Sequence, residues 1–380
     1  MRPKHPAAGG SFERASLAWM GGLPKGVSAA VVAAVIAGVV VAALLLTAGG
    51  GDNGKPATPT APSATKPGQP KTNAGRAAPR PGRQGVRRGH GTQPDVPAAG
   101  TGALLAIADQ KPETFTDPEF RRLGVARSRL NTPWNSIFTE PARLAAWLDA
   151  ARAAGVEPLV AFEHARGEPC PAQPCRLPST TDYTRAVRAF HARYPWVRLL
   201  QPWNEANSAT QPTGTKPERA AAYYEAVTTV CPSCIVTAAD VLDSGNLTRW
   251  LARFRAALHG PAPQLWGLHN YSDTNRFHND GTRRMLAAVP GQVWLTEAGG
   301  IVSFKTAEGR VALPYDEQRA ARAIRYLFKL AASSRRITRV YIYQWKIDFP
   351  GNRFDAGLVG PDSTPRPALQ VVLQRRSLLR

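Results

Sequence analysis

The chain has 380 residues, of which 43% are hydrophobic, and it carries a formal net charge of +21. Its four cysteines are too few for a disulfide-dense miniprotein, and its 33 Gly and 34 Pro follow no collagen period. Residues 1–50 hold four basic residues and one acidic residue, and residues 51–100 hold eight and two, so the first 100 residues supply 3 + 6 = 9 of the excess charges. A basic tail therefore accounts for much of the charge, and we expect no specific nucleic-acid partner.

Residues 26–48 have the sequence of a transmembrane helix. No charged residue occurs between Gly26 and Gly51, and about 20 apolar helical residues cross a bilayer core. The positive-inside rule places the basic residues 1–25 in the cytoplasm and the rest of the chain outside the cell. The alternative is a cleaved signal peptide and a secreted protein. The length of the apolar run and the lack of a clear small-x-small cleavage site favour the retained anchor in the cell membrane.

Residues 49–100 form the next segment, which contains nine Pro and no Leu, Ile, Phe, Trp or Tyr. Such a composition buries too little apolar surface to offset the entropy of ordering, which predicts a disordered linker. Its basic charge could associate with anionic envelope polymers or lipid headgroups.

From residue 101 to residue 380, short apolar runs alternate with amphipathic stretches, a pattern that indicates βα units and a parallel sheet. The clearest helices are Pro141–Ala154, Lys216–Val230 and Tyr315–Ala332. The eight expected strands are Gly102–Ala108, Gly124–Leu130, Glu157–Glu163, Val197–Trp203, Ile235–Val241, Leu265–Tyr271, Gln292–Glu297 and Arg339–Trp345.

Eight βα units in about 280 residues predict an α/β fold of the (β/α)8 TIM barrel type, preceded by the transmembrane helix and the linker. An open doubly wound sheet is the alternative. No G-x-G-x-x-G follows the first strand, which removes the main dinucleotide signature, and we expect no cofactor. In a barrel the chemistry lies at the carboxyl ends of the strands.

Polar and aromatic residues gather at those ends. Two of them, Glu205 and Glu297, should project from nearly opposite sides of one ring. Paired carboxylates in an aromatic-lined cleft suit glycosidic cleavage, because one donates a proton to the leaving oxygen while the other attacks the anomeric carbon or activates water. Trp faces supply flat apolar surface for sugar rings.

The strand-4 motif Trp203-Asn204-Glu205 and the strand-7 motif Thr296-Glu297-Ala298-Gly299 resemble the clan of retaining glycoside hydrolases on (β/α)8 barrels. In that clan the acid/base follows strand 4 and the nucleophile follows strand 7. The resemblance covers roughly residues 102–373 and includes His269-x-Tyr271 and Trp345 on the last strand.

The resemblance implies the roles of individual residues. Glu205 would be the acid/base and Glu297 the nucleophile, and Asn204 would hydrogen-bond the sugar 2-hydroxyl. Tyr271 would hydrogen-bond Glu297, Trp345 would form the floor of the cleavage subsite, and Arg129 would lie beneath the nucleophile. Arg127 lies two residues earlier on the same strand face, and the sequence does not choose between the two arginines.

Three further residues are candidate substrate contacts. His269 is expected to line the ring as a hydrogen-bonding group rather than as a metal ligand, and we expect no metal. His164 is either a substrate contact or a satisfied histidine at the top of the barrel. Trp134 is either a sugar platform or a loop-packing residue.

The cysteines come as Cys170-x4-Cys175 and Cys231-x2-Cys234. A shared four-thiolate zinc site is conceivable. The first pair follows strand 3 and the second precedes strand 5, so they should lie at opposite ends of the barrel. Outside the cell, two local disulfides are therefore expected.

These features predict a monomeric, membrane-anchored extracellular glycosidase that cleaves a poly- or oligosaccharide with retention. One alternative is a tethered carbohydrate-binding barrel without turnover. Another is an envelope-tethering protein that binds anionic polymers through its linker. The sugar, the linkage and the endo or exo mode depend on loop shapes that the sequence does not give.

Overall fold

The computed structural model describes residues 102–172, 175–347 and 349–379. Nine strands in this part of the chain form two parallel sheets, in the orders β1-β11-β8-β7-β6 and β2-β3-β4-β5. The strands are β1 (Leu104–Ala108), β2 (Arg127–Pro133), β3 (Glu157–Glu163), β4 (Leu199–Gln201), β5 (Ile235–Val236), β6 (Asp240–Leu242), β7 (Leu265–His269), β8 (Gln292–Ala298) and β11 (Ile337–Tyr343).

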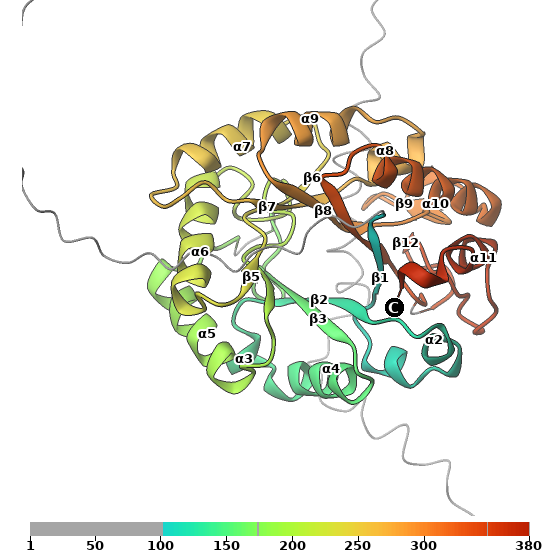
Figure 1. Ribbon diagram of the computed structural model, residues 1–380, viewed down its shortest axis with the longest axis horizontal. Coiled ribbons are helices and arrows are strands. Elements are labelled where there is room, and N and C mark those ends of the chain that lie inside the picture. The colour runs from blue at the N-terminus through green and yellow to red at the C-terminus, as the bar shows by residue number, and fades with distance from the viewer. Residues whose placement is uncertain (1–101, 173–174, 348, 380) are drawn as a thin grey trace, which may run out of the picture.

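The two sheets continue into each other at both edges. β1 packs beside β2, and only three residues of chain separate β5 from β6. Figure 1 shows the resulting ring of strands with helices around its outside. The parallel α/β architecture is confirmed, and the ring differs from the open doubly wound sheet that was the alternative.

Helices follow most of the strands and cover the ring. They are η2 (Pro112–Thr116), α2 (Pro118–Leu123), α3 (Ser136–Thr139), α4 (Pro141–Ala153), α5 (Thr180–Arg193), α6 (Pro217–Val230), α7 (Leu247–Ala256), α8 (Tyr271–Arg276), α9 (Asp280–Ala288), α10 (Glu317–Ala332), α11 (Pro367–Leu373) and η3 (Arg376–Leu378). The longest, α10, begins where the Asp316 side chain accepts a hydrogen bond from the Arg319 amide. This bond satisfies one of the backbone donors left open at a helix start.

The hydrophobic core has two layers. The larger lies between strands and helices, where Trp203 stacks on Tyr223 of α6 and Trp147 of α4 is buried. The smaller fills the interior of the ring and includes Leu159, Leu199 and Tyr341. Strands that are buried on both faces read as continuous apolar runs, which explains why the sequence pattern located them.

Several predicted strands differ in their bounds from the observed ones, and the second and the fifth show the clearest local reasons. The second was expected at Gly124–Leu130 but lies at Arg127–Pro133, because Gly124 has a φ of 68° and ends helix α2. The fifth was expected as one strand, Ile235–Val241, but is divided into β5 and β6. Its backbone changes neighbour between these two pieces: Thr237 donates to Leu200 on the β4 side, and Ala238 donates to Leu265 at the start of β7.

A small antiparallel sheet was not predicted. It has the order β10-β9-β12 and comprises β9 (Ser303–Lys305), β10 (Val311–Leu313) and β12 (Phe354–Asp355), from the segments that follow β8 and β11. These segments lie beyond the carboxyl ends of the parallel strands, so the sheet adds a wall beside the ring opening.

Both expected disulfides are confirmed, Cys170–Cys175 after β3 and Cys231–Cys234 between α6 and β5. They lie at different ends of the strands, as predicted. Among the described residues, no helix combines the length and apolar character that crossing a bilayer requires. The predicted anchor at 26–48, the linker at 49–100 and the basic segment 1–25 lie outside the described residues.

Candidate active site

Glu205 and Glu297 are brought together inside the ring although 92 positions separate them in the chain (297 minus 205). Glu205 lies in the turn after β4, Glu297 lies on β8, and each is only 5% exposed. One carboxylate oxygen of each lies within 4.8 Å of the other. The two acids therefore face a common space, as the strand positions predicted.

The backbone at Glu205 is in an unusual conformation, with a φ of 47°. A non-glycine residue in this left-handed region costs free energy and persists only where its surroundings hold it. Here the Asn204 amide donates to the Phe162 carbonyl at 2.6 Å, and the Ala206 amide donates to the Asp240 carbonyl at 2.8 Å. The neighbouring strands thus fix the turn that aims Glu205 inward.

Arg129, in the middle of β2, is completely buried beneath Glu297. Its Nη1 donates to Glu297 Oε2 at 2.6 Å, and its Nη2 donates to Asp240 Oδ2 at 2.9 Å. Arg129 also donates hydrogen bonds to Gln201 Oε1 and Asn204 Oδ1, each of 2.6 Å. Arg127 instead approaches Glu157 at 3.7 Å, whereas Arg129 bonds to Glu297 directly, so Arg129 is the arginine of this site.

Tyr271, the first residue of α8, donates its hydroxyl proton to Glu297 Oε1 at 3.0 Å. Together with Arg129, it gives each oxygen of Glu297 a donor. Such donors fix the position and orientation of the carboxyl group. The observed contacts of Arg129 and Tyr271 are those that the resemblance implied.

His269 connects Glu205 to a third buried acid. Its Nδ1 lies 3.0 Å from Glu205 Oε1, and its Nε2 lies 3.0 Å from Asp240 Oδ2. Burial by itself lowers the pKa of His269. The charges of Asp240 and Glu297 outweigh this effect and raise the pKa to about 10. Burial raises the pKa of Asp240, but His269 and Arg129 lower it to about 2. The imidazole is therefore a cation at neutral pH and donates to an acid on each side.

The pKa of Glu205 is shifted upward, in contrast to that of Asp240. Burial raises its pKa to about 7, an effect that the bond and charge of His269 reduce and the charge on Glu297 increases. A carboxyl group with this pKa is substantially protonated at neutral pH and can donate a proton.

Asp240 is the main site residue that the sequence analysis does not identify. Its Oδ2 holds both Arg129 and His269, and the Thr296 hydroxyl donates to its Oδ1. A glycine makes room for it: a Cβ on Gly267 would lie 2.5 Å from Asp240 Oδ1. The available signal was an acid at the start of a strand otherwise composed of apolar residues.

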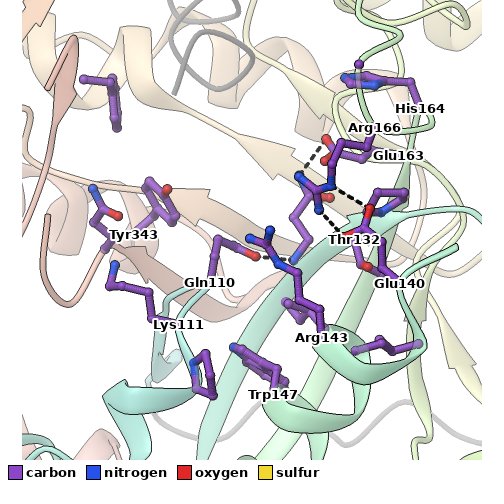
Figure 2. A pocket seen from close by; sticks show the side chains of 18 of the residues that line it. Gln110, Lys111, Thr132, Glu140, Arg143, Trp147, Glu163, His164, Arg166 and Tyr343 are labelled. Carbon is purple, nitrogen blue, oxygen red and sulfur yellow. Dashed lines mark hydrogen bonds and ion pairs between the residues drawn. The ribbon is translucent and has the colours of Figure 1, made fainter. Parts of the chain in front are cut away.

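A cleft leads outward from the acid pair. Its deeper part, the inner hollow, is lined by Gln110, Asn131, Glu163, Asn204, Glu205, Gln211, Glu297 and Tyr343. A wider part, the outer hollow, shares four of these residues: Gln110, Asn131, Glu163 and Tyr343. The two hollows therefore form one continuous cleft. Figure 2 shows the outer hollow, where His164 lies near Glu163 and Arg166.

Two predicted substrate contacts lie elsewhere. Trp345 is 1% exposed, packs edge-on against Phe120 and donates its indole proton to Asp117 at 2.9 Å. The reason is that β11 ends at Tyr343, so the chain has turned away before Trp345, and Tyr343 lines the cleft instead.

Trp134 follows the end of β2 and does not line either hollow. Its ring is partly buried and lies 6.5 Å from that of Tyr183 on α5. It therefore has the loop-packing role that was the alternative to a sugar platform. His164 does line the outer hollow.

Two groups of side chains have the donor types of a metal site. One is Glu205, His269 and Glu297, with ligand atoms within 4.8 Å of one another. Both ring nitrogens of His269 already lie 3.0 Å from carboxylate oxygens, those of Glu205 and Asp240, so neither nitrogen is open to a metal. The other group contains Cys231 and Cys234, whose thiolates are consumed in a disulfide. Neither group therefore fits a resident metal.

Buried paired carboxylates at the carboxyl ends of parallel strands, with an open cleft beside them, are the arrangement that glycosidases use. The family model described as glycosyl hydrolase catalytic core matches residues 178–370, just over half of the chain. The chain therefore belongs to this family, and the clan-level resemblance of its motifs is confirmed. Among curated proteins, no match was found.

Solved structures with TM-scores of 0.50 and 0.51 share the fold at low identity. A family 39 glycoside hydrolase from Bacteroides cellulosilyticus WH2 is 17% identical with a TM-score of 0.49, and the match covers 72% of this chain and 64% of that one. A monomeric β-xylosidase from Caulobacter crescentus CB15 is 15% identical with a TM-score of 0.51, and the match covers 71% of this chain and 66% of that one. Xylanase 10B from Thermotoga petrophila RKU-1, in complex with xylobiose, is 12% identical with a TM-score of 0.50, and the match covers 73% of this chain and 94% of that one. The chain thus spans slightly less than two thirds of the first two proteins, and identities this low support the fold alone.

Replacing Asp240 with Asn should lower the pKa of His269, because Asp240 is the neighbour that raises it most. The variant should also lose about 3–5 kcal/mol of stability, since Arg129 and His269 keep buried positive charge with one partner fewer. An NMR titration of the His269 ring and chemical denaturation measure the two effects. Asp243→Asn is the matched control, because Asp243 is equally buried but accepts from the Ser272 and Asp273 amides. An unchanged His269 titration in Asp240→Asn would contradict this account.

Proposed function

We propose that this protein is a membrane-anchored extracellular glycosidase that cleaves poly- or oligosaccharide with retention of configuration, on a (β/α)8 barrel. The observation that carries the proposal is the approach of Glu205 and Glu297 to within 4.8 Å. Retaining enzymes hold their two carboxyl groups about 5–5.5 Å apart, whereas inverting enzymes leave about 6.5–9.5 Å for a water molecule. The observed separation supports the retaining arrangement.

Glu297 is the proposed nucleophile. Arg129 and Tyr271 hold its carboxylate in place, each with a hydrogen bond to one of its oxygens. One oxygen of Glu297 forms a bond to the anomeric carbon while the bond from that carbon to the leaving oxygen breaks. Asn204, whose Oδ1 accepts from Arg129, presents its NH2 group to the sugar 2-hydroxyl.

Glu205 is the proposed acid/base. In the first step its proton moves to the leaving oxygen. Glu297 then becomes a neutral ester, so it no longer raises the pKa of Glu205. Glu205 can now accept a proton from water, whose oxygen attacks the anomeric carbon and releases Glu297 as a carboxylate. The same residue therefore serves as acid and then as base.

Covalent trapping tests the nucleophile. Incubating the protein with a panel of activated 2-deoxy-2-fluoro glycosides should add the mass of one fluoroglycosyl group, located on Glu297 by peptide mapping. Glu297→Gln should lose the label, and Glu308→Gln should keep it, because Glu308 is exposed in the turn between β9 and β10 and lines neither hollow. NMR of the first-formed product should show the starting anomer. Attachment elsewhere or an inverted product would refute this mechanism, and sugar binding with neither label nor product would favour the non-catalytic carbohydrate-binding barrel.

The pH profile tests the acid/base. Since Glu205 must start protonated and its pKa is about 7, kcat/KM should fall as pH rises through that value. Glu205→Gln should remove this alkaline limb and slow substrates with poor leaving groups by about 10²–10⁴-fold. Substrates with activated leaving groups should lose less in the first step, because they leave without a proton. Unchanged turnover of poor leaving groups in the variant would show that Glu205 is not the acid.

The location of the enzyme follows from residues 1–100. The apolar run at 26–48, the preceding basic residues and the Pro-rich linker support a retained anchor with the catalytic part outside. The full chain should stay in the membrane fraction through a high-salt wash, and added protease should digest the catalytic part on intact cells. A chain lacking residues 1–48 should be retained only at low salt, if the linker binds anionic polymers. Release of the full chain into the medium would instead indicate a cleaved signal peptide.

A further inference from the structure

We propose that the end of the ring opposite the cleft docks on an anionic phospholipid bilayer, so that the catalytic part lies on the membrane with its cleft facing away. The inference rests on the proposed function only in taking the chain to be anchored. We call this end the lower face. It comprises the segments that run from the last turn of each helix to the next ring strand, together with the last turn of α11 and the residues after it. In a ring of parallel strands, these segments gather at the amino ends of the strands, opposite the active site.

The lower face is rich in basic residues. Its segments hold thirteen Lys or Arg residues and a single acid, Glu157, an excess of twelve. Residues 101–380 hold 36 basic and 24 acidic residues, so their net charge is also +12. The positive excess of the catalytic part therefore lies on this face. The thirteen basic residues are Arg121, Arg122, Arg127, Arg152, Arg193, Arg198, Arg253, Arg255, Lys329, Arg335, Arg336, Arg375 and Arg376.

Most of these cations have no acid partner. Arg122, Arg127 and Arg253 form ion pairs with glutamates. Among the described residues, the other ten form no ion pair with an acid, and nine of these ten are exposed. Two further acids, Asp149 and Glu225, precede these segments on α4 and α6. Counting both of them against the ten cations still leaves an excess of eight.

Several of the ten cations connect neighbouring segments through neutral groups. Arg336 donates to three carbonyl groups of the segment before β8, and Arg255 donates to Ala288 of that segment at 2.6 Å. Arg198, before β4, donates to the Ser233 carbonyl before β5 at 2.6 Å. A carbonyl oxygen holds a guanidinium in place without neutralising its charge. The segments therefore form one surface that remains positive.

The helix dipole explains only part of this pattern. Cations in the last turn of a helix are stabilised by its dipole, an effect that fades within that turn. Arg198, Arg335 and Arg336 lie beyond the ends of their helices. At the other end of the ring, the first turns of α2, α5, α6, α9 and α10 each carry an acid. Charge is thus distributed unevenly along the ring axis, and a molecule of this kind turns its positive end toward an anionic surface.

The chain enters the catalytic part at the lower face. β1 begins at Leu104, and a Cβ on Gly102 would lie 3.9 Å from Leu378 of η3, the segment that also holds Arg376. Figure 1 shows α11 on the β1 side of the ring. The proposed anchor at 26–48 therefore joins the catalytic part at its positive end, which favours a bilayer over a soluble polyanion as the partner. Anionic headgroups attract each nearby basic residue by about fivefold in the binding constant.

Energy transfer from a dye to the bilayer tests the docking. The full chain is reconstituted into vesicles of phosphatidylcholine alone or of phosphatidylcholine mixed equally with phosphatidylglycerol. All four cysteines are in disulfides, so one introduced Cys gives a single dye site. Ser377→Cys labels the lower face, and Ala307→Cys labels the turn between β9 and β10 at the cleft end. On anionic vesicles, transfer to a lipid acceptor should be greater from position 377 than from position 307. The difference should shrink on neutral vesicles and with added salt.

Two triple variants with equal charge changes locate the effect. The lower variant removes three exposed cations and should reduce the ratio of docked to undocked molecules by about 10²-fold, from about fivefold for each residue. The control variant removes three exposed cations from segments that follow strands at the cleft end, and it should preserve the transfer difference. The lower variant combines Arg121→Gln, Lys329→Gln and Arg335→Gln. The control variant combines Arg176→Gln, Arg249→Gln and Arg310→Gln. The basic linker is the same in both, so it cannot cause a difference between them.

Equal transfer from the two dye positions on anionic vesicles would overturn the proposal, as would equal effects of the two triple variants. If transfer is equal and the lower variant alone loses binding to dextran sulfate, the face is a polymer site and the bilayer proposal is wrong. Failure of the proposed function gives different results. Flotation with neutral vesicles reports the anchor, and product release reports the hydrolase. A chain that fails either assay but gives greater transfer from position 377 on anionic vesicles still has the docking face.

Discussion

The site depends on one buried guanidinium. Arg129 lies in the middle of β2 with no exposure, where an unpaired charge would be very costly. Its surroundings supply two carboxylates and two amide oxygens, from β4, β6, β8 and the turn after β4. These elements are far apart in the chain. Because an unpartnered Arg129 would be costly, its bonds favour the arrangement in which these parts of the ring lie around it. The nucleophile candidate Glu297 is placed as one of those partners.

The positive charge of Arg129 also makes the environments of Glu205 and Glu297 different. Glu297 has a donor at each oxygen, from Arg129 and from Tyr271. Glu205 instead contacts the ring of His269, which lowers its pKa. Burial raises the pKa of Glu205 by more, so the result is about 7. Two residues of one chemical type thus have different environments: two donors hold the carboxylate of Glu297, whereas burial raises the pKa of Glu205.

The sequence was sufficient to locate residues whose position depends on strand periodicity. Glu205, Glu297 and Tyr271 lie at or just beyond the carboxyl ends of the predicted apolar runs, although β4 already ends at Gln201 and β7 at His269. Trp345 was misplaced because the last strand ends two residues earlier than the apolar pattern suggests, at Tyr343. Where a strand ends depends on its pairing with neighbours, and a single chain segment does not contain that information.

Asp240 illustrates a second kind of limit. Its importance lies in contacts with Arg129 and His269, which are 111 and 29 positions away. Nothing local distinguishes it from an acid that ends a strand, and Gly267 reveals the space made for it only after folding. The choice between Arg127 and Arg129 had the same origin, since both lie on one face of β2 and only depth in the ring separates them.

The cleft combines parts of unequal rigidity. Glu297 and Arg129 lie within strands, and their bonds cross the ring, so the chemistry is fixed by the scaffold. The outer hollow is built from residues that follow strands or begin helices, among them Lys111, Arg143 and His164. Such segments tolerate substitution better than ring strands do, because fewer buried contacts depend on them. A protein built in this way can keep one bond-breaking mechanism while the charge and shape of the neighbouring wall determine which glycan reaches it.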